Sequence, residues 1–122
     1  MGADEALTPL EIEHFRSLLL EERRAADARM KDRAAAIPAT VRQDDETGDY
    51  TDEGAALAER DRILIENELD SELLGRIDHA LERVGEGSYG VSEVSGARIP
   101  VERLEAVPWA TTLANEEPVE DE

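Results

Sequence analysis

Residues 80–110 read ALERVGEGSYGVSEVSGARIPVERLEAVPWA, and the turn signals in this stretch decide how the chain folds. Gly85 and Gly87 come at the end of an apolar periodic segment, where glycine commonly terminates a helix. The residues before Pro100 have the pattern of a short hairpin, and the run after this proline predicts one short helix. Pro108 stops that helix because proline has no amide proton to donate. The stretch therefore predicts a long helix followed by a small, largely irregular subdomain.

From about Asp52 or Ala55 to Val84, the chain predicts a long helix with a coiled-coil seam. Apolar residues recur three and four positions apart, at Leu74, Ile77, Leu81 and Val84. The same spacing continued toward the N-terminus reaches Ile63 and two polar residues, Asn67 and Asp70, and polar seam positions can fix the register of a helix pair. Beside the seam lies a second apolar row that could receive a partner helix, formed by Ile65, Leu69 and Leu73.

Another long helix is predicted near the N-terminus, from about residue 8 to 37. Thr8 and Glu11 have the spacing of a capping box, and Pro9 occupies the first helical position. Apolar residues then recur at helical spacing, among them Ile12, Phe15, Leu18, Leu19, Ala26 and Met30. Pro38 is expected to end this helix, because a proline inside a helix breaks its hydrogen-bond ladder.

The segment that connects the two helices, residues 38–54, reads PATVRQDDETGDYTDEG. It is polar, acidic and broken by glycine and proline, so we expect a loop or a short irregular tip, with room for one turn of helix near its end. Two amphipathic helices of matching length with a short connection predict an antiparallel helical hairpin, so the fold class is mainly α. Because a hairpin alone buries little apolar surface, the subdomain after residue 87 is expected to cover its open end.

The charge balance excludes several classes of function. The chain has 31 acidic and 13 basic residues, a net charge of −18, which disfavours binding to nucleic-acid phosphates or to an anionic membrane surface. There is no cysteine, so neither a disulfide framework nor a thiolate zinc site can form. His14 and His79 are far apart in the sequence, and we expect neither a metal nor another cofactor. A basic cleft on another protein is the partner that this charge suits.

The sequence also lacks the signals of an enzyme or a membrane protein. No nucleophile–base pair and no phosphate-binding glycine loop is present, so we expect no catalytic activity. The acidic N-terminus has no apolar core of a signal peptide, and no apolar run reaches the length of a membrane span. We therefore expect a cytoplasmic protein.

Several short motifs, in this order of elements, carry a resemblance to a known family. They are Gly87-Ser88-Tyr89-Gly90, Gly96 with Ile99, Arg103-Leu104-Glu105-Ala106, and Pro108. Over most of residues 8–116 the chain resembles the DksA/TraR family of bacterial transcription regulators. The resemblance implies a coiled-coil hairpin joined to a four-cysteine zinc finger. It also implies that the protein binds RNA polymerase and inserts the hairpin into the secondary channel, without sequence-specific contact to nucleic acid.

The resemblance divides the chain into a hairpin over residues 1–87, a finger-like subdomain over 88–114 and an acidic tail over 115–122, which we expect to be disordered. The positions of the four zinc ligands fall on Ser92, Ser95, Leu113 and Glu116. Neutral serine is a poor zinc ligand and leucine is none, so the finger is predicted to be degenerate and metal-free. Packing must then replace the metal, and the candidates are Val91, Val94, Ile99, Leu104, Val107, Trp109 and Leu113.

At the hairpin tip the family carries two aspartates three positions apart, followed by an alanine. Asp49 and Asp52 match the aspartates, and Gly54 replaces the alanine. Glycine loosens a helix, so binding to the polymerase is expected to survive while the effect of the tip on initiation changes. Further negative charge nearby comes from Asp44, Asp45 and Glu46.

The family also has a site for the alarmone ppGpp, built from basic residues. The corresponding positions here are Arg76, Val107 and Glu117, so one of the three keeps its positive charge. We therefore expect weak or no dependence on ppGpp. A hairpin of this kind is expected to be a monomer. The alternative function is an acidic helical adaptor that binds another basic protein surface, and a third is a nucleic-acid mimic. Acids cluster at the tip and tail, which favours binding through the tip over mimicry.

Overall fold

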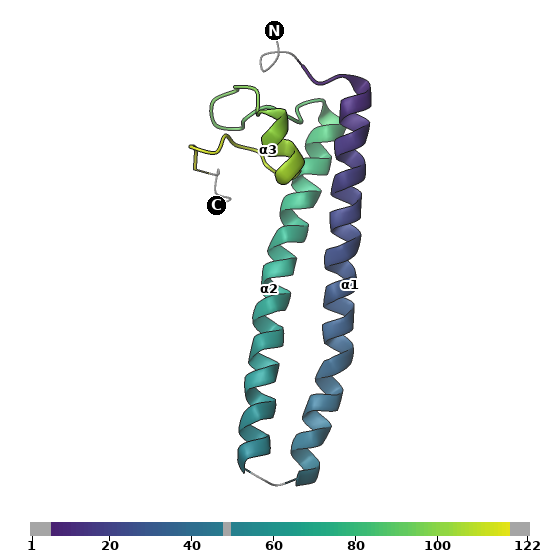
Figure 1. The fold of residues 1–122 in the computed structure, drawn as a ribbon, viewed down its shortest axis with the longest axis vertical. Helices are drawn as coiled ribbons and strands as arrows, with labels where there is room; N and C mark the ends of the chain where they lie inside the picture. The colour runs from purple at the N-terminus through teal and green to yellow at the C-terminus, as the bar shows by residue number, and fades with distance from the viewer. Residues whose placement is uncertain (1–5, 48–49, 118–122) are drawn as a thin grey trace. The chain divides into compact units, whose positions relative to one another are not determined.

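The computed structural model describes the backbone of residues 6–47 and 50–117, and the side chains of residues 6–36 and 54–117. The described chain is mainly α-helical, as the sequence predicted. Its elements, in order, are α1 (Pro9–Thr47), α2 (Tyr50–Glu86) and the short α3 (Val101–Ala106) (Figure 1). The chain forms two compact units. We call residues 24–74 the hairpin unit, and residues 1–23 together with 75–122 the head unit.

The beginning of α1 has the capping box that the sequence predicted. The amide of Thr8 donates to Glu11 Oε1 at 2.8 Å, and the amide of Glu11 donates to Thr8 Oγ1 at 3.1 Å. These two bonds satisfy backbone groups that the first turn of a helix otherwise leaves without partners.

The prediction that Pro38 ends α1 was wrong, because the helix continues to Thr47. Proline removes one hydrogen bond and crowds the preceding turn, which kinks a helix without having to end it. Between Pro38 and Gly48 the sequence has no further proline or glycine. The predicted irregular tip over 38–54 is therefore helical up to Thr47 and again from Tyr50, and residues 48 and 49 lie outside the described part.

The hairpin unit pairs α1 with α2 through a narrow apolar core. Ala26, Ala56 and Ile63 are buried there, and Asp70 is buried among them with 8% exposure. Small alanine side chains let two helices approach closely, at the cost of burying little apolar surface. The seam predicted for α2 is thus confirmed at Ile63 and at Asp70, its polar position.

The end of α2 has the geometry of a Schellman motif. Gly87 follows the helix with φ +84°, and its amide donates to Val84 O at 3.3 Å. The next amide, that of Ser88, reaches back to Arg83 O at 2.9 Å. Gly87 is required here because other L-residues seldom adopt this left-handed backbone.

The core of the head unit brings together α1, α2, α3 and the loops around α3. Its buried apolar residues are Phe15, Leu19, Ile77, Ala80, Val84, Tyr89, Ile99, Leu104 and Ala110. The ring centroids of Phe15 and Tyr89 lie 5.9 Å apart, and the Tyr89 hydroxyl donates to Pro108 O at 2.7 Å. Burial of a large apolar side chain contributes about 1.5–3 kcal/mol relative to exposure. This core is what holds the finger-like segment on the two helices.

Of the residues proposed to replace a metal by packing, Ile99 and Leu104 are buried in this core. Four more are half-buried, namely Val91, Val107, Trp109 and Leu113. The prediction was wrong for Val94, which is 52% exposed. Val94 lies in the turn of the finger-like segment, within a run of exposed residues, 94–97. None of the described helices has an apolar stretch long enough to cross a membrane.

Candidate functional site

The finger-like segment of the head unit begins with a tight antiparallel turn. Val91 pairs with Arg98 in an isolated β-bridge. The amide of Ser92 donates to Ala97 O at 2.8 Å, and the amide of Ile99 donates to Gly90 O at 2.9 Å. The sequence predicted a short hairpin here, and the turn places Ser92 and Ser95 on the side of the segment that meets residues 113–116.

Glu116 is the centre of a hydrogen-bond cluster at the positions predicted for the lost zinc ligands. Ser92, which is 3% exposed, donates its hydroxyl to Glu116 Oε1 at 2.5 Å. The same carboxylate oxygen accepts the amide of Leu113 at 2.8 Å. Ser92 Oγ also accepts the amides of Val94 at 3.0 Å and Ser95 at 3.2 Å. We call Ser92, Ser95, Leu113 and Glu116 the finger cluster.

The finger cluster holds its carboxylate in the ionised form. Hydrogen bonds from Ser92 and Ser95, and from the backbone of Leu113, lower the pKa of Glu116 below its ordinary value. A carboxylate that accepts several hydrogen bonds is favoured over the neutral acid. In the sequence Glu116 belongs to the predicted acidic tail, whereas in the structure it closes the finger-like segment. Among the described residues no group of three His, Cys, Asp or Glu side chains could hold a metal ion.

A second carboxylate, Glu93, ties the finger-like segment to α2. Its Oε1 lies 2.6 Å from His79 Nε2 and 3.5 Å from Arg83 Nη1. Arg83 Nη2 in turn donates to Ser88 O at 2.8 Å and to Val91 O at 2.5 Å. Burial acts to raise the pKa of Glu93, but hydrogen bonds from His79 and Thr111 and the charges of His79 and Arg83 lower it.

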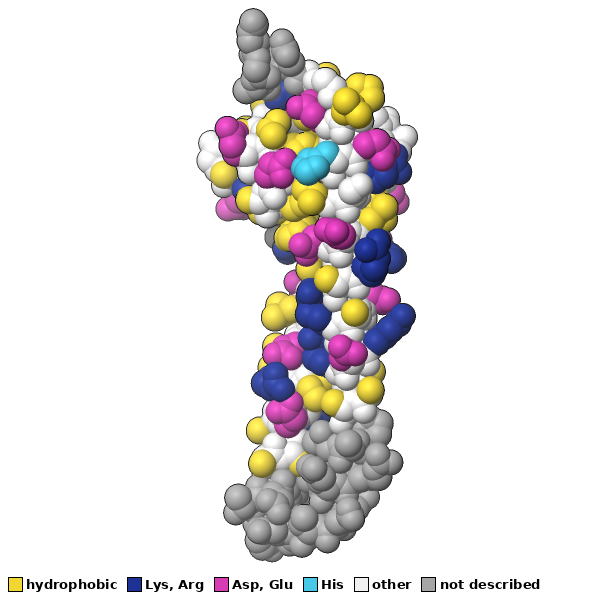
Figure 2. Space-filling model, turned by 45° about the vertical axis from the view of Figure 1, so that its right-hand side comes forward, with side chains coloured by type: hydrophobic (Ala, Val, Ile, Leu, Met, Phe, Trp, Pro, Cys, Tyr) yellow, Lys and Arg dark blue, Asp and Glu magenta, His cyan; other side chains and the backbone are white. Residues whose placement is uncertain are grey.

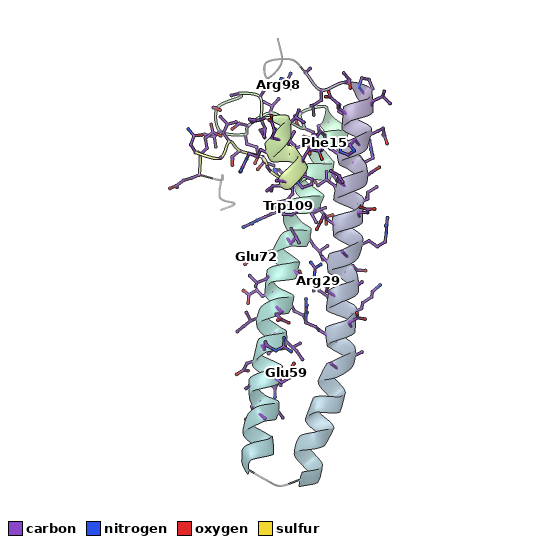
Figure 3. The ribbon with its side chains drawn as sticks, in the orientation of Figure 1. Phe15, Arg29, Glu59, Glu72, Arg98 and Trp109 are labelled. Carbon is purple, nitrogen blue, oxygen red and sulfur yellow. The ribbon has the colours of Figure 1, made fainter. Side chains whose placement is uncertain are left out.

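The hairpin unit has its own charged network, at the polar seam position Asp70. Arg29, labelled in Figure 3, donates from Nη2 to Asp70 Oδ1 at 2.8 Å. Arg33 pairs with Asp70 Oδ2. Arg33 Nε also donates to Asn67 Oδ1 at 2.8 Å. The hydrogen bonds from Arg29 and Arg33 lower the pKa of Asp70 to about 2, against a smaller opposing effect of burial. Because a slip by one helical turn would separate these partners, the network fixes the register of α1 against α2.

The predicted tip residues lie largely outside the described part. Asp49 is outside it, and so are the side chains of Asp44, Asp45, Glu46 and Asp52. Gly54 is exposed in α2, and a Cβ at this position would meet nothing within 4 Å. The other predicted partner-binding position that the structure describes is Arg76, an exposed residue of α2. Among the positions of the expected ppGpp site, Val107 is half-buried and Glu117 is exposed.

Three residues that organise these sites have no direct signal in the sequence. Arg29 is an exposed residue of α1, yet its guanidinium reaches the buried Asp70. Arg83 and Glu93 were not singled out at all. The only available signal was that Asp70 needs a cation, and Arg29 and Arg33 are four residues apart on one helix face.

Comparison with solved structures identifies a known fold that this chain resembles. The solved structure of transcription factor DksA2 from Pseudomonas aeruginosa is similar with a TM-score of 0.75 and 30% sequence identity, over 86% of this chain and 78% of that one. No protein-family model matches the chain.

Among curated proteins, the chain is 42% identical over 72 residues to general stress protein 16O of Bacillus subtilis, covering 58% of this chain and 44% of that protein. It is also 42% identical over 67 residues to the RNA polymerase-binding transcription factor DksA of Caulobacter vibrioides, covering 55% and 42%. An uncharacterized Bacillus subtilis protein, YteA, is 46% identical over 63 residues, covering 52% and 26%. The chain thus spans less than half the length of these curated relatives.

The fold is that of helical-hairpin proteins in which a small finger-like segment follows the second long helix. The similarity to the DksA2 structure covers both parts, and the chain belongs to the DksA/TraR family. Within that family it is a variant without cysteine, in which hydrogen bonds of the finger cluster occupy the predicted zinc-ligand positions.

Proposed function

We propose that this protein binds RNA polymerase and regulates transcription by inserting the α1–α2 connection into the secondary channel. The single observation that carries the proposal is the similarity to transcription factor DksA2, which extends over both the hairpin and the finger-like segment. The sequence similarity to the RNA polymerase-binding transcription factor DksA supports the choice of partner.

The physical support comes from the way the hairpin presents its acidic connection. α1 continues to Thr47 and α2 begins at Tyr50, so the acidic segment is carried on two helices rather than in a long loop. Asp52 lies in the first turn of α2, where a negative charge is favoured by the helix dipole. Carboxylates presented in this way suit a basic or metal-containing site that only a narrow structure can enter.

We further propose that the protein acts without zinc. The finger cluster joins residue 92 to residue 116 through hydrogen bonds, and the surrounding core supplies the remaining stability. Dependence on ppGpp should be weak or absent. Arg76 is the one cation left at the expected site, and the exposed carboxylate of Glu117 would repel a phosphate-rich ligand.

The test is competition for core RNA polymerase against a known secondary-channel factor at near-physiological salt. Wild type should compete, and Asp49→Asn/Asp52→Asn should still bind but lose its effect on transcription. The matched control is Glu21→Gln/Asp32→Asn, which neutralises two exposed carboxylates of α1 away from the connection. This control should behave as wild type in both assays.

Absence of competition by the wild-type protein would reject the proposal and favour the acidic adaptor. Equal loss of transcriptional effect in the tip variant and in the control would reject the role of the tip alone. A strong enhancement of the transcriptional effect by added ppGpp would contradict the expected ppGpp independence.

A further inference from the structure

In the hairpin unit, the side of α2 that faces away from α1 carries exposed apolar side chains. Leu57 and Leu64, seven residues apart, lie on one row of the helix and are 47% and 51% exposed. Ile65 and Leu69, four residues apart, lie on a neighbouring row and are both 61% exposed. Figure 2, which brings the α1 side forward, shows that apolar side chains also lie among charged ones on that face. A soluble helix gains nothing from such residues unless another surface covers them.

Exposed carboxylates run between the two apolar rows. Asp61, Glu68 and Glu72 all project on this side, and Figure 3 shows Glu72 on the side of α2 away from α1. None of the three forms an ion pair with a described side chain. Their neighbours Glu59 and Glu66, by contrast, both pair with Arg62. The unpaired acids are therefore the ones that lie among the exposed apolar residues.

We propose that this side of α2 docks a basic amphipathic helix of a partner protein. We call it the outer α2 surface, and its residues are Asp61, Leu64, Ile65, Glu68, Leu69 and Glu72. A partner helix with apolar residues at intervals of three and four would cover the apolar rows, as in other helix-on-helix recognition. Lysine or arginine side chains on that helix would meet the central carboxylates, and the apolar rows would shield these pairs from water.

Charge complementarity selects this occupant over a second copy of the chain. In a symmetric dimer through the outer α2 surface, the carboxylates of one copy would face those of the other. Each copy also carries a net charge of −18, which adds long-range repulsion. The surface lies on residues 61–72 and excludes the acidic connection, so the inference goes beyond the role proposed for the tip.

The experiment uses the full chain and a synthetic probe, a fluorescent helical peptide of leucine and lysine with all leucines on one face. A second peptide has the same composition in scrambled order. Binding is followed by fluorescence anisotropy at near-physiological salt. Ile65→Ser/Leu69→Ser should weaken binding of the amphipathic peptide by about tenfold or more. Leu10→Ser/Leu20→Ser, at exposed positions of α1, is the matched control and should leave the affinity unchanged.

A second variant tests the carboxylates of the outer α2 surface separately from its apolar residues. Glu68→Gln/Glu72→Gln should weaken binding and reduce its dependence on salt, whereas Glu21→Gln/Asp32→Asn should not. Circular dichroism of each variant checks that the helices are retained, which is expected because all substituted side chains are exposed.

Three results would overturn the proposal. The first is equal binding of the scrambled peptide, which would mean attraction by net charge alone. The second is equal weakening by the control variants, which would mean that binding is not confined to the outer α2 surface. The third is self-association of the wild-type chain in sedimentation experiments that Ile65→Ser/Leu69→Ser abolishes, which would make the occupant a second copy.

Discussion

Ser92 donates its hydroxyl to Glu116 at 2.5 Å, across a separation of 24 residues in the sequence. In a four-cysteine finger two thiolates at these positions would both bind one metal ion. Here one side chain donates a proton and the other accepts it, so the same two segments are joined by a neutral hydroxyl and a carboxylate. The bond is directional and local, and the buried apolar core must supply most of the free energy that a metal would have contributed.

Ser92→Ala should destabilise the head unit. The buried hydroxyl accepts two backbone amides and donates to Glu116, and its removal leaves these groups without their partner. We expect a loss of about 1–3 kcal/mol in the free energy of unfolding. Urea denaturation followed by circular dichroism measures it. Ser95→Ala, at an exposed position of the same turn, is the control and should cost less. If both variants lose the same free energy of unfolding, the buried hydrogen bonds of Ser92 contribute no more than those of the exposed Ser95.

Metal chelators should leave the fold intact. The chain has no cysteine, and the described residues contain no group of three metal-binding side chains. The melting temperature should therefore be the same with excess chelator, with added zinc and with neither. Differential scanning calorimetry measures this, and elemental analysis of the purified protein should find no stoichiometric zinc. A melting temperature that drops with chelator would contradict the metal-free finger.

Acid should destabilise the hairpin unit through Asp70. Its pKa is lowered from 3.8 to about 2 by Arg29 and Arg33, so the stabilisation is fully present above pH 4. It is lost as the pH falls through the folded-state pKa, and amounts to on the order of 2 kcal/mol. Asp70→Asn should lower stability at pH 7 by about this amount and flatten the acid limb of the stability curve. Urea titrations from pH 7 to pH 2 test this. An unchanged slope between pH 4 and pH 2 in the variant would refute the assignment to Asp70.

Gly54→Ala should stabilise α2 and change the activity of the tip. A Cβ at this position meets nothing within 4 Å, and alanine is favoured over glycine in a helix by up to about 1 kcal/mol. Gly75→Ala is the matched control, since Gly75 also lies in α2 with nothing nearby. Both variants should unfold at higher urea concentration, but only Gly54→Ala should alter transcription in an assay with purified polymerase. Identical transcription by both variants would indicate that a glycine at 54 does not set the effect of the tip.

The sequence predicted the helical hairpin well because two separate signals agreed. Thr8 and Glu11 marked where α1 begins, and Gly87 marked where α2 ends. Pro38 was misread because its effect on a helix is local. One lost hydrogen bond is a small part of the ladder of a 39-residue helix, so α1 continues to Thr47.

The sequence predicted which positions form the finger cluster, but not which chemical groups would interact there. The resemblance to a zinc finger identified Ser92 and Glu116 as neighbours in the fold, and the structure brings them together. It did not show that a glutamate would serve as the acceptor, because an acid near the C-terminus also fits a solvated tail. The partners of long side chains were harder to predict than the finger cluster. Arg29 can reach from the solvent side to Asp70, so its residue number alone does not reveal its partner.

The contacts of the head unit imply an order of folding. Arg83 bonds to Val91 across only 8 residues, and Ser92 to Glu116 across 24, whereas His14 meets Glu105 across 91. Contacts between nearby residues close small loops and form quickly, while distant ones are slower. The C-terminal half of the head unit can therefore assemble on the end of α2 before the beginning of α1 docks. During synthesis α1 leaves the ribosome first, and Phe15 has to wait for most of the chain before Tyr89 can pack against it.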